Sequence, residues 1–300
     1  MWKPDVFLCG PSAAKLFLEI GGAKRLYEEP DFMSDVKHFA GVSAGAAMTL
    51  LLVLGYTVDE IIDLCMDLTI IDDLATINLD EAKEKFGLIR NQTIEKKLFD
   101  AIARKIGFIP TLKQLYCLTG LEWTAVTFNV DKMKEEFLNY LSEPDLSVLE
   151  AVMMSMALPF LIQPRQYRGY SFLDGAITAP LPTLYFDHSG NKVLALYISS
   201  EEDLSYSDKQ PTTFLYRLVQ AGMKALRDFN IEYSSENVKY IPLKTSIKDI
   251  TGLFLSKETR QKMVDYGYSC ASNFLKVNSD PDKYKINLGE NEEIEFKNNF

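Results

Sequence analysis

The sequence predicts an α/β fold in which a mainly parallel sheet is covered by helices on both faces. Short apolar segments with strand character alternate with longer segments of helical periodicity, which is the pattern of such folds. No internal repeat and no linker rich in Pro, Gly or Ser divides the 300 residues, and 47% hydrophobic side chains can fill one large core. We therefore expect one domain over residues 1–278, followed by a charged tail over residues 279–300.

The N-terminal elements follow the order strand, loop, helix, strand, helix. Residues 5–10 form a short apolar segment typical of a buried strand, and after the loop at residues 10–15 a helix is expected to about residue 29. A second strand at residues 36–40 leads into a very apolar helix from Ser43 to Gly55. The apolar run at residues 39–55 is borderline in length for a membrane span, but its three glycines and its polar residues favour a buried strand-turn-helix. Thr57 and Glu60 have the spacing of a capping box and start another helix.

The remaining chain continues the alternation. Asn91 opens an amphipathic helix that Gly107 closes, and Ser147 and Glu150 form a second capping box, whose methionine-rich helix stops before Pro159. The methionines of that helix are expected to fill the core rather than to face lipid. Strands are expected at residues 121–130, 170–173, 193–199 and 238–242, and helices at residues 213–227 and 256–275.

Charge and cysteine usage restrict the class of protein. The 42 acidic and 32 basic side chains give a formal net charge of −10, which argues against a nucleic-acid partner. The densest basic group lies in one expected helix, and we interpret it as a solvated helix face rather than a lipid-binding patch: Lys96, Lys97, Arg104 and Lys105. Four scattered cysteines, two histidines and an N-terminus without an apolar signal segment predict a cytoplasmic protein without a metal site or disulfide framework.

A candidate nucleophile lies between the second strand and the apolar helix. Residues 41–45 match Gly-x-Ser-x-Gly around Ser43. A strand before the serine and a helix after it are what a nucleophile elbow requires, because the sharp turn exposes the hydroxyl and tolerates only small neighbours. The helix N-terminus would also place backbone N–H groups and a partial positive charge beside the hydroxyl oxygen.

The serine needs a base, and the sequence offers more than one. His38 lies within the strand that leads to the elbow, and His188 lies in a polar turn, so both are interpreted as structural residues. Asp174 ends an expected strand and is followed by Gly175. Because the ends of parallel strands collect at one edge of a sheet, Asp174 and Ser43 could meet there.

At this point the residues resemble a known family. The segment from Gly41 to Ala46, the run Ser155-Met156-Ala157-Leu158-Pro159 and the Asp174-Gly175-Ala176 motif resemble the patatin-like phospholipases in type and order. Weaker similarity extends over residues 5–275. The resemblance implies a three-layer α/β/α fold and a Ser/Asp dyad without histidine that acts on acyl esters of phospholipids or glycerolipids. Ser43 would then be acylated, and Asp174 would accept its proton and later activate water.

The resemblance also implies an oxyanion hole in the loop after the first strand. Family members have a glycine-rich loop there, whereas this chain has Gly10, Pro11, Ser12 and Ala13. Proline has no N–H, so Gly10, Ser12 and Ala13 are the expected donors. The family's asparagine after the aspartate motif is also replaced, by the run Ile177-Thr178-Ala179-Pro180.

The sequence therefore predicts a serine acyl hydrolase that works without cofactor on an acyl-ester lipid, with transient contact to a membrane surface. Lipase, phospholipase A and acyltransferase activities stay open. Two alternatives come from other classes: a patatin-like scaffold with little catalysis that binds lipid or protein, and an α/β hydrolase that uses His188 in a triad.

Overall fold

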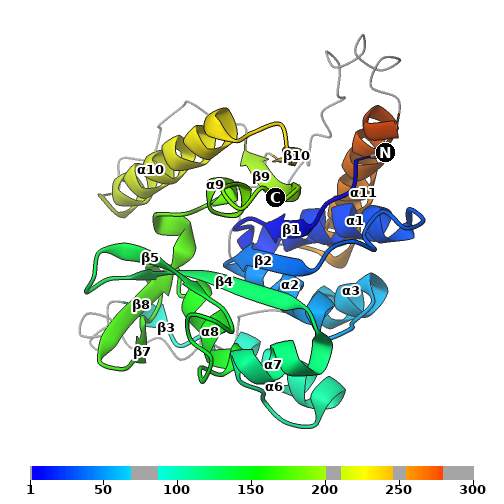
Figure 1. Cartoon of the computed structure of the whole chain (residues 1–300). Coiled ribbons are helices and arrows are strands. Elements are labelled where there is room, and N and C mark those ends of the chain that lie inside the picture. Colours follow the sequence, from blue (N-terminus) through cyan, green and yellow to red (C-terminus); the bar gives the residue numbers. More distant parts are fainter. Residues whose placement is uncertain (1, 69–86, 201–210, 246–254, 280–300) are drawn as a thin grey trace.

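The computed structural model of the chain describes residues 2–68, 87–200, 211–245 and 255–279, and its centre is an eight-stranded sheet (Figure 1). The strand order is β10-β9-β1-β2-β4-β8-β7, with β5 paired to β4. The strands are β1 (Val6–Cys9), β2 (His38–Val42), β4 (Glu122–Asn129), β5 (Lys134–Leu138), β7 (Arg165–Tyr167), β8 (Tyr170–Asp174), β9 (Val193–Ser200) and β10 (Val238–Thr245). The predicted α/β fold with a largely parallel sheet is confirmed.

The sheet is mixed, so the expectation that Asp174 and Ser43 meet at the ends of parallel strands is wrong. Strands β10, β9, β1, β2 and β4 are parallel, but β8 runs antiparallel to β4, with Thr127 opposite Asp174. Asp174 therefore does not reach the serine as the end of a parallel neighbour. It comes close because β8 starts beyond the end of β2 and runs back toward it, a strand direction that local sequence does not encode.

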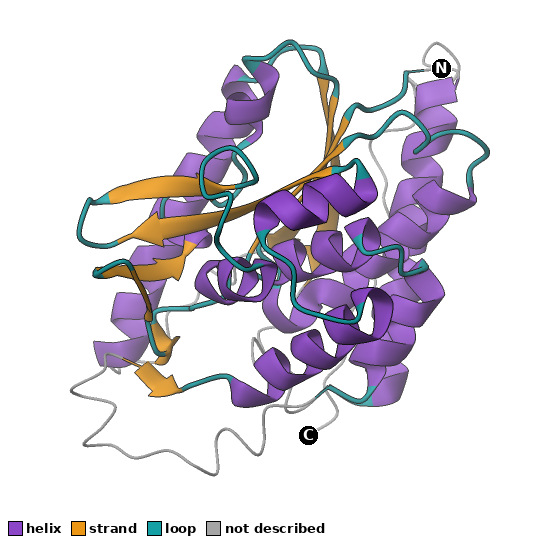
Figure 2. Cartoon of the chain, turned by 60° about the horizontal axis from the view of Figure 1, so that its bottom comes forward, coloured by secondary structure: helices purple, strands orange, loops and turns teal. Residues whose placement is uncertain are grey.

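Helices cover both faces of the sheet, in layers of unequal thickness (Figure 2). Alternate residues of β1 point to opposite faces. Phe7 and Cys9 belong to the large core shared with seven helices: α1 (Leu16–Glu28), α2 (Ala44–Val53), α3 (Val58–Met66), α6 (Gln92–Ile106), α7 (Leu112–Thr119), α8 (Val148–Ser155) and α11 (Lys257–Ser279). Val6 and Leu8 belong to a smaller core under α9 (Thr183–Asp187) and α10 (Pro211–Tyr233). The three-layer arrangement that the family resemblance implies is present.

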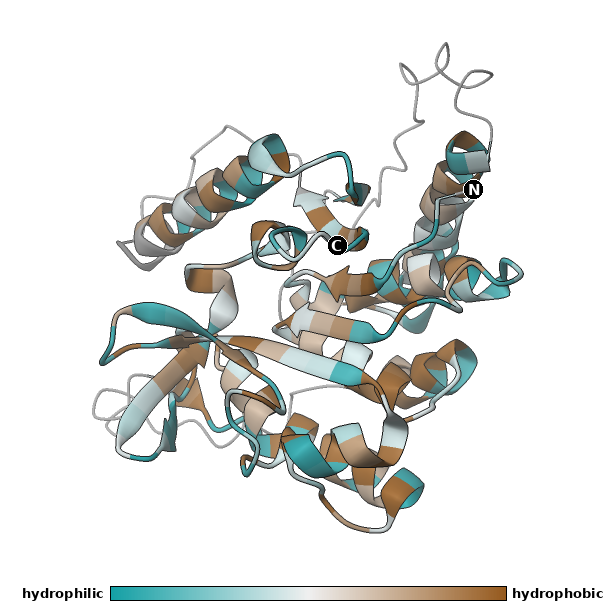
Figure 3. Cartoon of the chain, in the orientation of Figure 1, coloured by the Kyte–Doolittle hydropathy of each residue, from teal (hydrophilic) through white to brown (hydrophobic). Residues whose placement is uncertain are grey.

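The most apolar part of the sequence is the centre of the molecule (Figure 3). Residues 38–53 comprise β2, Ser43 and α2, and every residue of α2 is buried, so the expected buried strand-turn-helix is confirmed. Met153 and Met154 are also fully buried, as expected of core filler. Within the described ranges, no helix combines the length and hydropathy needed to cross a bilayer.

Three helix starts were predicted from capping residues, and they carry the expected side-chain bonds fully, partly and not at all. The capping box at Thr57 is complete, because its hydroxyl accepts from Glu60 N and the Glu60 carboxylate accepts from Thr57 N. At Ser147 only the hydroxyl bond forms, since the Glu150 carboxylate binds Arg165 instead. Asn91 does precede α6, but in a left-handed conformation and without a side-chain cap.

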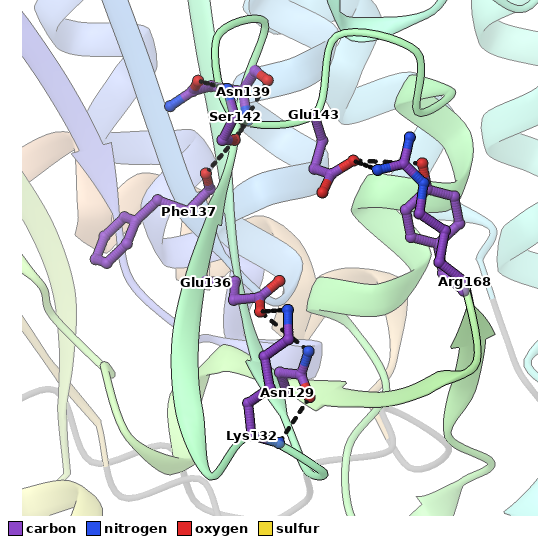
Figure 4. Close-up of polar contacts among 9 residues, drawn as sticks. Asn129, Lys132, Glu136, Phe137, Asn139, Ser142, Glu143 and Arg168 are labelled. Atoms are coloured by element: carbon purple, nitrogen blue, oxygen red, sulfur yellow. Dashed lines mark hydrogen bonds and ion pairs between the residues drawn. The ribbon is translucent and has the colours of Figure 1, made fainter.

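Several elements were not predicted. A two-stranded parallel sheet joins β3 (Gly87–Ile89) to β6 (Phe160–Ile162), and β5 forms a hairpin with β4. Polar contacts brace this hairpin (Figure 4): Asn129 donates to the Glu136 carboxylate at 3.0 Å and Lys132 pairs with the same carboxylate at 2.9 Å. Helices α10 and α11 extend beyond their predicted ends. The expected tail lies, apart from Ser279 in α11, outside the described residues, and the proposed domain boundary stays a prediction.

Candidate active site

Ser43 lies in the sharp turn between β2 and α2, in strained backbone geometry. Its φ of 58° and ψ of −128° are unfavourable for a residue with a side chain. Surrounding hydrogen bonds hold this conformation: Ser43 N donates to Ser155 Oγ at 2.9 Å, and Ser43 O accepts from Ala46 N at 2.9 Å. The turn has the geometry of a nucleophile elbow, with the hydroxyl at the N-terminus of a helix.

The glycines around Ser43 permit close backbone contact. A Cβ added to Gly45 would overlap the carbonyl oxygen of Gly10, so only glycine lets the first turn of α2 pack on the end of β1. Likewise, a Cβ on Gly175 would overlap the carbonyl oxygen of Val126 on β4. The glycines of both motifs thus have a packing cause that does not depend on catalysis.

Asp174 ends β8 with its carboxyl group almost fully buried, the residue being 1% exposed. Its backbone N donates to Ala157 O at 2.9 Å, and its Oδ1 accepts from Ala176 N at 2.9 Å. Burial raises the pKa of Asp174 to about 7, although hydrogen bonds from Ser43 and from Ala176 lower it. A carboxyl group with this pKa is divided between its acid and carboxylate forms at neutral pH.

The structure brings Ser43 and Asp174 to the same cavity. The Ser43 hydroxyl is near enough to lower the pKa of Asp174, yet Asp174 Oδ2 has no hydrogen bond of good geometry to any described residue. We interpret the contact as a long or poorly aligned hydrogen bond. Such contacts are common in ligand-free sites and shorten when substrate binds.

The loop before α1 lies beside the serine. Gly10 N donates to Leu196 O at 2.9 Å, as part of the pairing between β1 and β9. Ser12 and Ala13 line the cavity that contains Ser43, and within the described residues neither of their N–H groups has a hydrogen-bond acceptor. Ala13 has a φ of 47°, a strained conformation for alanine.

Two cavities meet at Ser43. One, of about 190 Å³, is polar on several sides and takes its walls from the loop, Asp174 and α10: Ser12, Lys15, Asp174, Tyr197, Gln220, Lys224 and Arg227 are among its residues. The other, of about 170 Å³, has mainly apolar walls from α2, α3, α6 and the segment after α8: Met48, Leu51, Leu64, Leu98, Leu158 and Leu161 are among its residues. Ser43, Ala13 and Leu158 line both, so the hydroxyl stands at the junction.

The two histidines lie outside these cavities. His38 bonds Thr124 Oγ1 at 2.8 Å, and burial lowers its pKa to about 4. His188 is exposed at the end of α9, which leaves the histidine-triad alternative without geometric support. In the part of the chain that the structure describes, no group of three or more His, Cys, Asp or Glu side chains could hold a metal ion.

Ser155 is a functional candidate that sequence reasoning missed. It is fully buried at the end of α8, and its hydroxyl accepts from Ser43 N at 2.9 Å and donates to Val126 O at 2.6 Å. It thereby ties the elbow to β4. The only signal in the sequence was its place in the Ser-Met-Ala-Leu-Pro run that carries the family resemblance.

Comparison with known sequences gives a consistent result. A family model described as patatin-like phospholipase matches residues 13–187, a region that contains both Ser43 and Asp174. Probable lipid hydrolase 463L of Invertebrate iridescent virus 6 is 26% identical over 205 residues, covering 65% of this chain and 70% of the relative. Uncharacterized protein R571 of Acanthamoeba polyphaga mimivirus is 24% identical over 270 residues, covering 87% of this chain and 88% of the relative.

Solved structures share the fold at low sequence identity. VipD from Legionella pneumophila superposes with a TM-score of 0.56 at 16% identity, covering 91% of this chain and 67% of VipD. The type III effector ExoU of Pseudomonas aeruginosa superposes with a TM-score of 0.51 at 17% identity, covering 91% of this chain and 53% of ExoU. At these identities the likeness concerns the arrangement of the sheet and helices.

Proposed function

The chain belongs to the patatin-like phospholipase family, and from this premise we propose that it hydrolyses acyl esters of phospholipids or other glycerolipids through an acyl-enzyme on Ser43. The observation that carries the proposal is the meeting, in one cavity, of a strained serine at the N-terminus of α2 and a buried carboxyl group of raised pKa. The name of the viral relative, a probable lipid hydrolase, supports the same substrate class.

In the acylation step, the Asp174 carboxylate accepts the proton of the Ser43 hydroxyl while Oγ attacks the ester carbonyl carbon. The raised pKa matters here, because a carboxylate near the usual value of about 4 would be a weak base. The tetrahedral intermediate collapses when the bond to the alcohol oxygen breaks. That oxygen takes the proton from Asp174, and the alcohol product leaves.

In the deacylation step, Asp174 accepts a proton from water, and the hydroxide formed attacks the acyl carbon. Collapse breaks the bond to Ser43 Oγ, which regains its proton from Asp174, and the fatty acid leaves. No metal or organic cofactor takes part in this scheme.

The oxyanion of both steps needs N–H donors. Ser12 and Ala13 are the proposed donors, because the N–H of Gly10 is used in the bond to Leu196 O and Pro11 has none. The N-terminus of α2 adds a favourable dipole beside Ser43. Loss of one donor typically lowers kcat by about 10²- to 10³-fold, so the loop conformation decides how active the site is.

The two cavities suggest how a lipid would lie. The mainly apolar cavity suits an acyl chain, and the polar cavity beside Lys15, Lys224 and Arg227 suits the glycerol and headgroup. In this pose the ester carbonyl lies over the junction at Ser43. Contact with a membrane surface would be transient and peripheral.

A second candidate is a patatin-like module that binds lipid or protein with little or no catalysis. Pro11 favours it, because the loop of the oxyanion hole has lost one N–H. The two candidates differ in whether Ser43 is nucleophilic.

Labelling with a fluorophosphonate separates them, since only an activated serine is phosphonylated. Wild-type protein, Ser43→Ala and the matched control Ser189→Ala, whose serine is exposed at the end of α9, would be treated and the labelled peptide located by mass spectrometry. We expect label on Ser43 in the wild type and in Ser189→Ala, and none in folded Ser43→Ala. An unlabelled, folded wild type would reject the hydrolase in favour of the binding module.

A further inference from the structure

Glu19 is a buried carboxyl group that the proposed mechanism does not use. It lies in the first turn of α1, is 0% exposed and lines neither cavity. Its Oε2 accepts a hydrogen bond from Ser12 Oγ at 2.7 Å, while Oε1 has no partner in the described part of the chain. A half-satisfied carboxyl group in a core costs stability, so its place behind the loop at residues 10–15 calls for an explanation.

The loop that Glu19 touches is strained. Ala13 holds a φ of 47°, which a residue with a Cβ keeps only when its surroundings fix it. At its start the loop is anchored to β9, because Gly10 N donates to Leu196 O, and its final turn is closed internally by Lys15 N, which donates to Ser12 O at 2.9 Å. The bond from the Ser12 hydroxyl to Glu19 is the side-chain contact that fixes Ser12 against α1.

We propose that Glu19 is a positioning residue that, through its bond with the Ser12 hydroxyl, keeps the Ser12 and Ala13 N–H groups aimed at the oxyanion formed on Ser43. The inference rests on the proposed function and goes beyond it, because Glu19 never contacts the reacting atoms. It explains how this loop keeps a strained alanine in place.

The charge of Glu19 matters because it lies close behind the oxyanion donors. Burial raises the pKa of Glu19 to about 8, although the hydrogen bond from Ser12 and the proximity of the Gly10 backbone N–H lower it. At neutral pH the group is therefore mainly a neutral acid. Above pH 8 it becomes an anion, which would oppose the negative charge that develops on the substrate.

Neighbouring ionisable groups do not change this conclusion. Cys9 on β1 is electrostatically coupled to Glu19, but burial raises its pKa well above the usual value, so the thiol stays neutral over the same range. The other elements packed on α1 also carry ionisable side chains, but none of these is among the groups that shift the pKa of Glu19. They are Lys15 in the 3₁₀ turn, Asp59, Glu60, Asp63 and Cys65 on α3, Tyr197 on β9, and Lys257, Glu258, Arg260, Lys262, Asp265, Tyr266, Tyr268, Cys270 and Lys276 on α11.

The experiment compares Glu19→Gln, Glu19→Leu and the control Glu28→Gln, an exposed glutamate on the same helix, in kcat and KM for a soluble acyl ester between pH 6 and 10. The wild type and Glu28→Gln should lose kcat as the pH rises through about 8. Glu19→Gln keeps an oxygen that accepts from Ser12, so it should retain most of kcat at pH 7 and lack the alkaline fall. Glu19→Leu should lose at least about tenfold in kcat with little change in KM, as expected for an interaction made in the transition state.

Two further variants keep the test decisive if Glu19→Leu does not fold. Ser12→Ala removes only the hydroxyl and should lower kcat in the same way. Ala13→Gly, combined with Ser12→Ala, should restore part of kcat, because glycine adopts a φ of 47° without strain. A purely structural role of Glu19 predicts no such restoration.

The outcomes separate this inference from the proposed function. Fluorophosphonate labelling of Ser43 in the same wild-type preparation tests the hydrolase. If Ser43 is labelled but Glu19→Gln shows the same alkaline fall as the wild type, or folded Ser12→Ala keeps its kcat, the role of Glu19 is refuted and the hydrolase stands. If wild-type Ser43 is not labelled, both are refuted.

Discussion

The two cavities that meet at Ser43 differ in their walls and in how their sequence encodes them. The apolar cavity is built from helices whose side chains also continue the main core, such as Met48, Leu51 and Leu98. The polar cavity is built from strand ends, a strained loop and one face of α10. The walls of the apolar cavity therefore follow from the packing of the main core. The walls of the polar cavity depend in addition on specific hydrogen bonds and on buried ionisable groups.

The largest effect is expected from a substitution in the polar cavity alone. Asp174→Asn keeps the shape of the side chain but cannot accept the proton, so kcat should fall by roughly 10⁴-fold. Because the apolar cavity is untouched, the relative rates on short and long acyl esters should stay as in the wild type. Measuring kcat over a series of chain lengths checks both statements, and retained activity in the folded variant would contradict the role of Asp174.

The pH profile tests the same side without a mutation. The pKa of Asp174 is raised to about 7, and the carboxylate is the active form. On the acid side of the profile, activity is therefore lost as the pH falls below 7, by about tenfold per pH unit, which gives roughly 100-fold at pH 5. The loss should be equal for all acyl chains, and a profile flat down to pH 5 would exclude Asp174 as the base.

Filling the apolar cavity should change the preference for acyl-chain length and leave the chemistry at Ser43 intact. Leu64→Trp places a larger side chain in the wall formed by α3, so rates on long-chain esters should fall by about 10- to 100-fold while short-chain rates change little. Leu118→Trp, on the exposed side of α7, is the matched control. An equal loss on every chain length would show that the cavity does not hold the acyl chain.

Ser155 holds the turn at Ser43, where the two cavities meet. Ser155→Ala leaves the Ser43 N–H and the Val126 carbonyl without their partner, so the free energy of unfolding should fall by about 1–3 kcal/mol. The elbow should shift slightly, and kcat should fall roughly tenfold on all substrates. Denaturant unfolding and steady-state kinetics on one preparation separate the two effects, and Ser142→Ala in the exposed loop after β5 serves as the control.

The smallest effect is expected at the outer rim of the polar cavity. Lys224 lies on α10 with its side chain about half exposed and paired with Asp228. Lys224→Glu should lower the rate on anionic relative to zwitterionic vesicles by about fivefold, and the difference should shrink in salt. Lys113→Glu on α7 is the control, and an unchanged ratio would remove Lys224 from headgroup contact.

Much of the fold was predictable because its signals are local. The Thr57 capping box and the apolar run of β2 and α2 depend on residues adjacent in sequence, and both appear as expected. The direction of β8 was not predictable, since it depends on which side of β4 the chain returns. The hairpin strand β5 was missed because its sequence is highly charged, and its order comes from pairing and from contacts such as that between Asn129 and Glu136.

The residues of the candidate site that stand in local motifs were also predictable from the sequence. Ser43 and Asp174 stand in recognisable motifs, and the structure brings them to one cavity, while their catalytic roles stay predictions. Ser155 and Glu19 have no local sequence signature, because their hydrogen bonds are made to residues of other segments: Ser155 bonds Ser43 and Val126, and Glu19 bonds Ser12. The signal of Glu19 is an acidic residue between apolar neighbours in the first turn of α1.

The bond from Gly10 N to Leu196 O has a consequence for where the chain can be cut. Leu196 lies on β9, beyond the region that matches the family model, so a fragment ending at residue 187 would lose β9 and β10 and leave β1 as an open edge. Such a fragment would carry both motif residues yet lack the strand that anchors the start of the loop. Adding residues 188–300 as a separate polypeptide would supply that strand by edge pairing, which makes this position suitable for split-protein complementation.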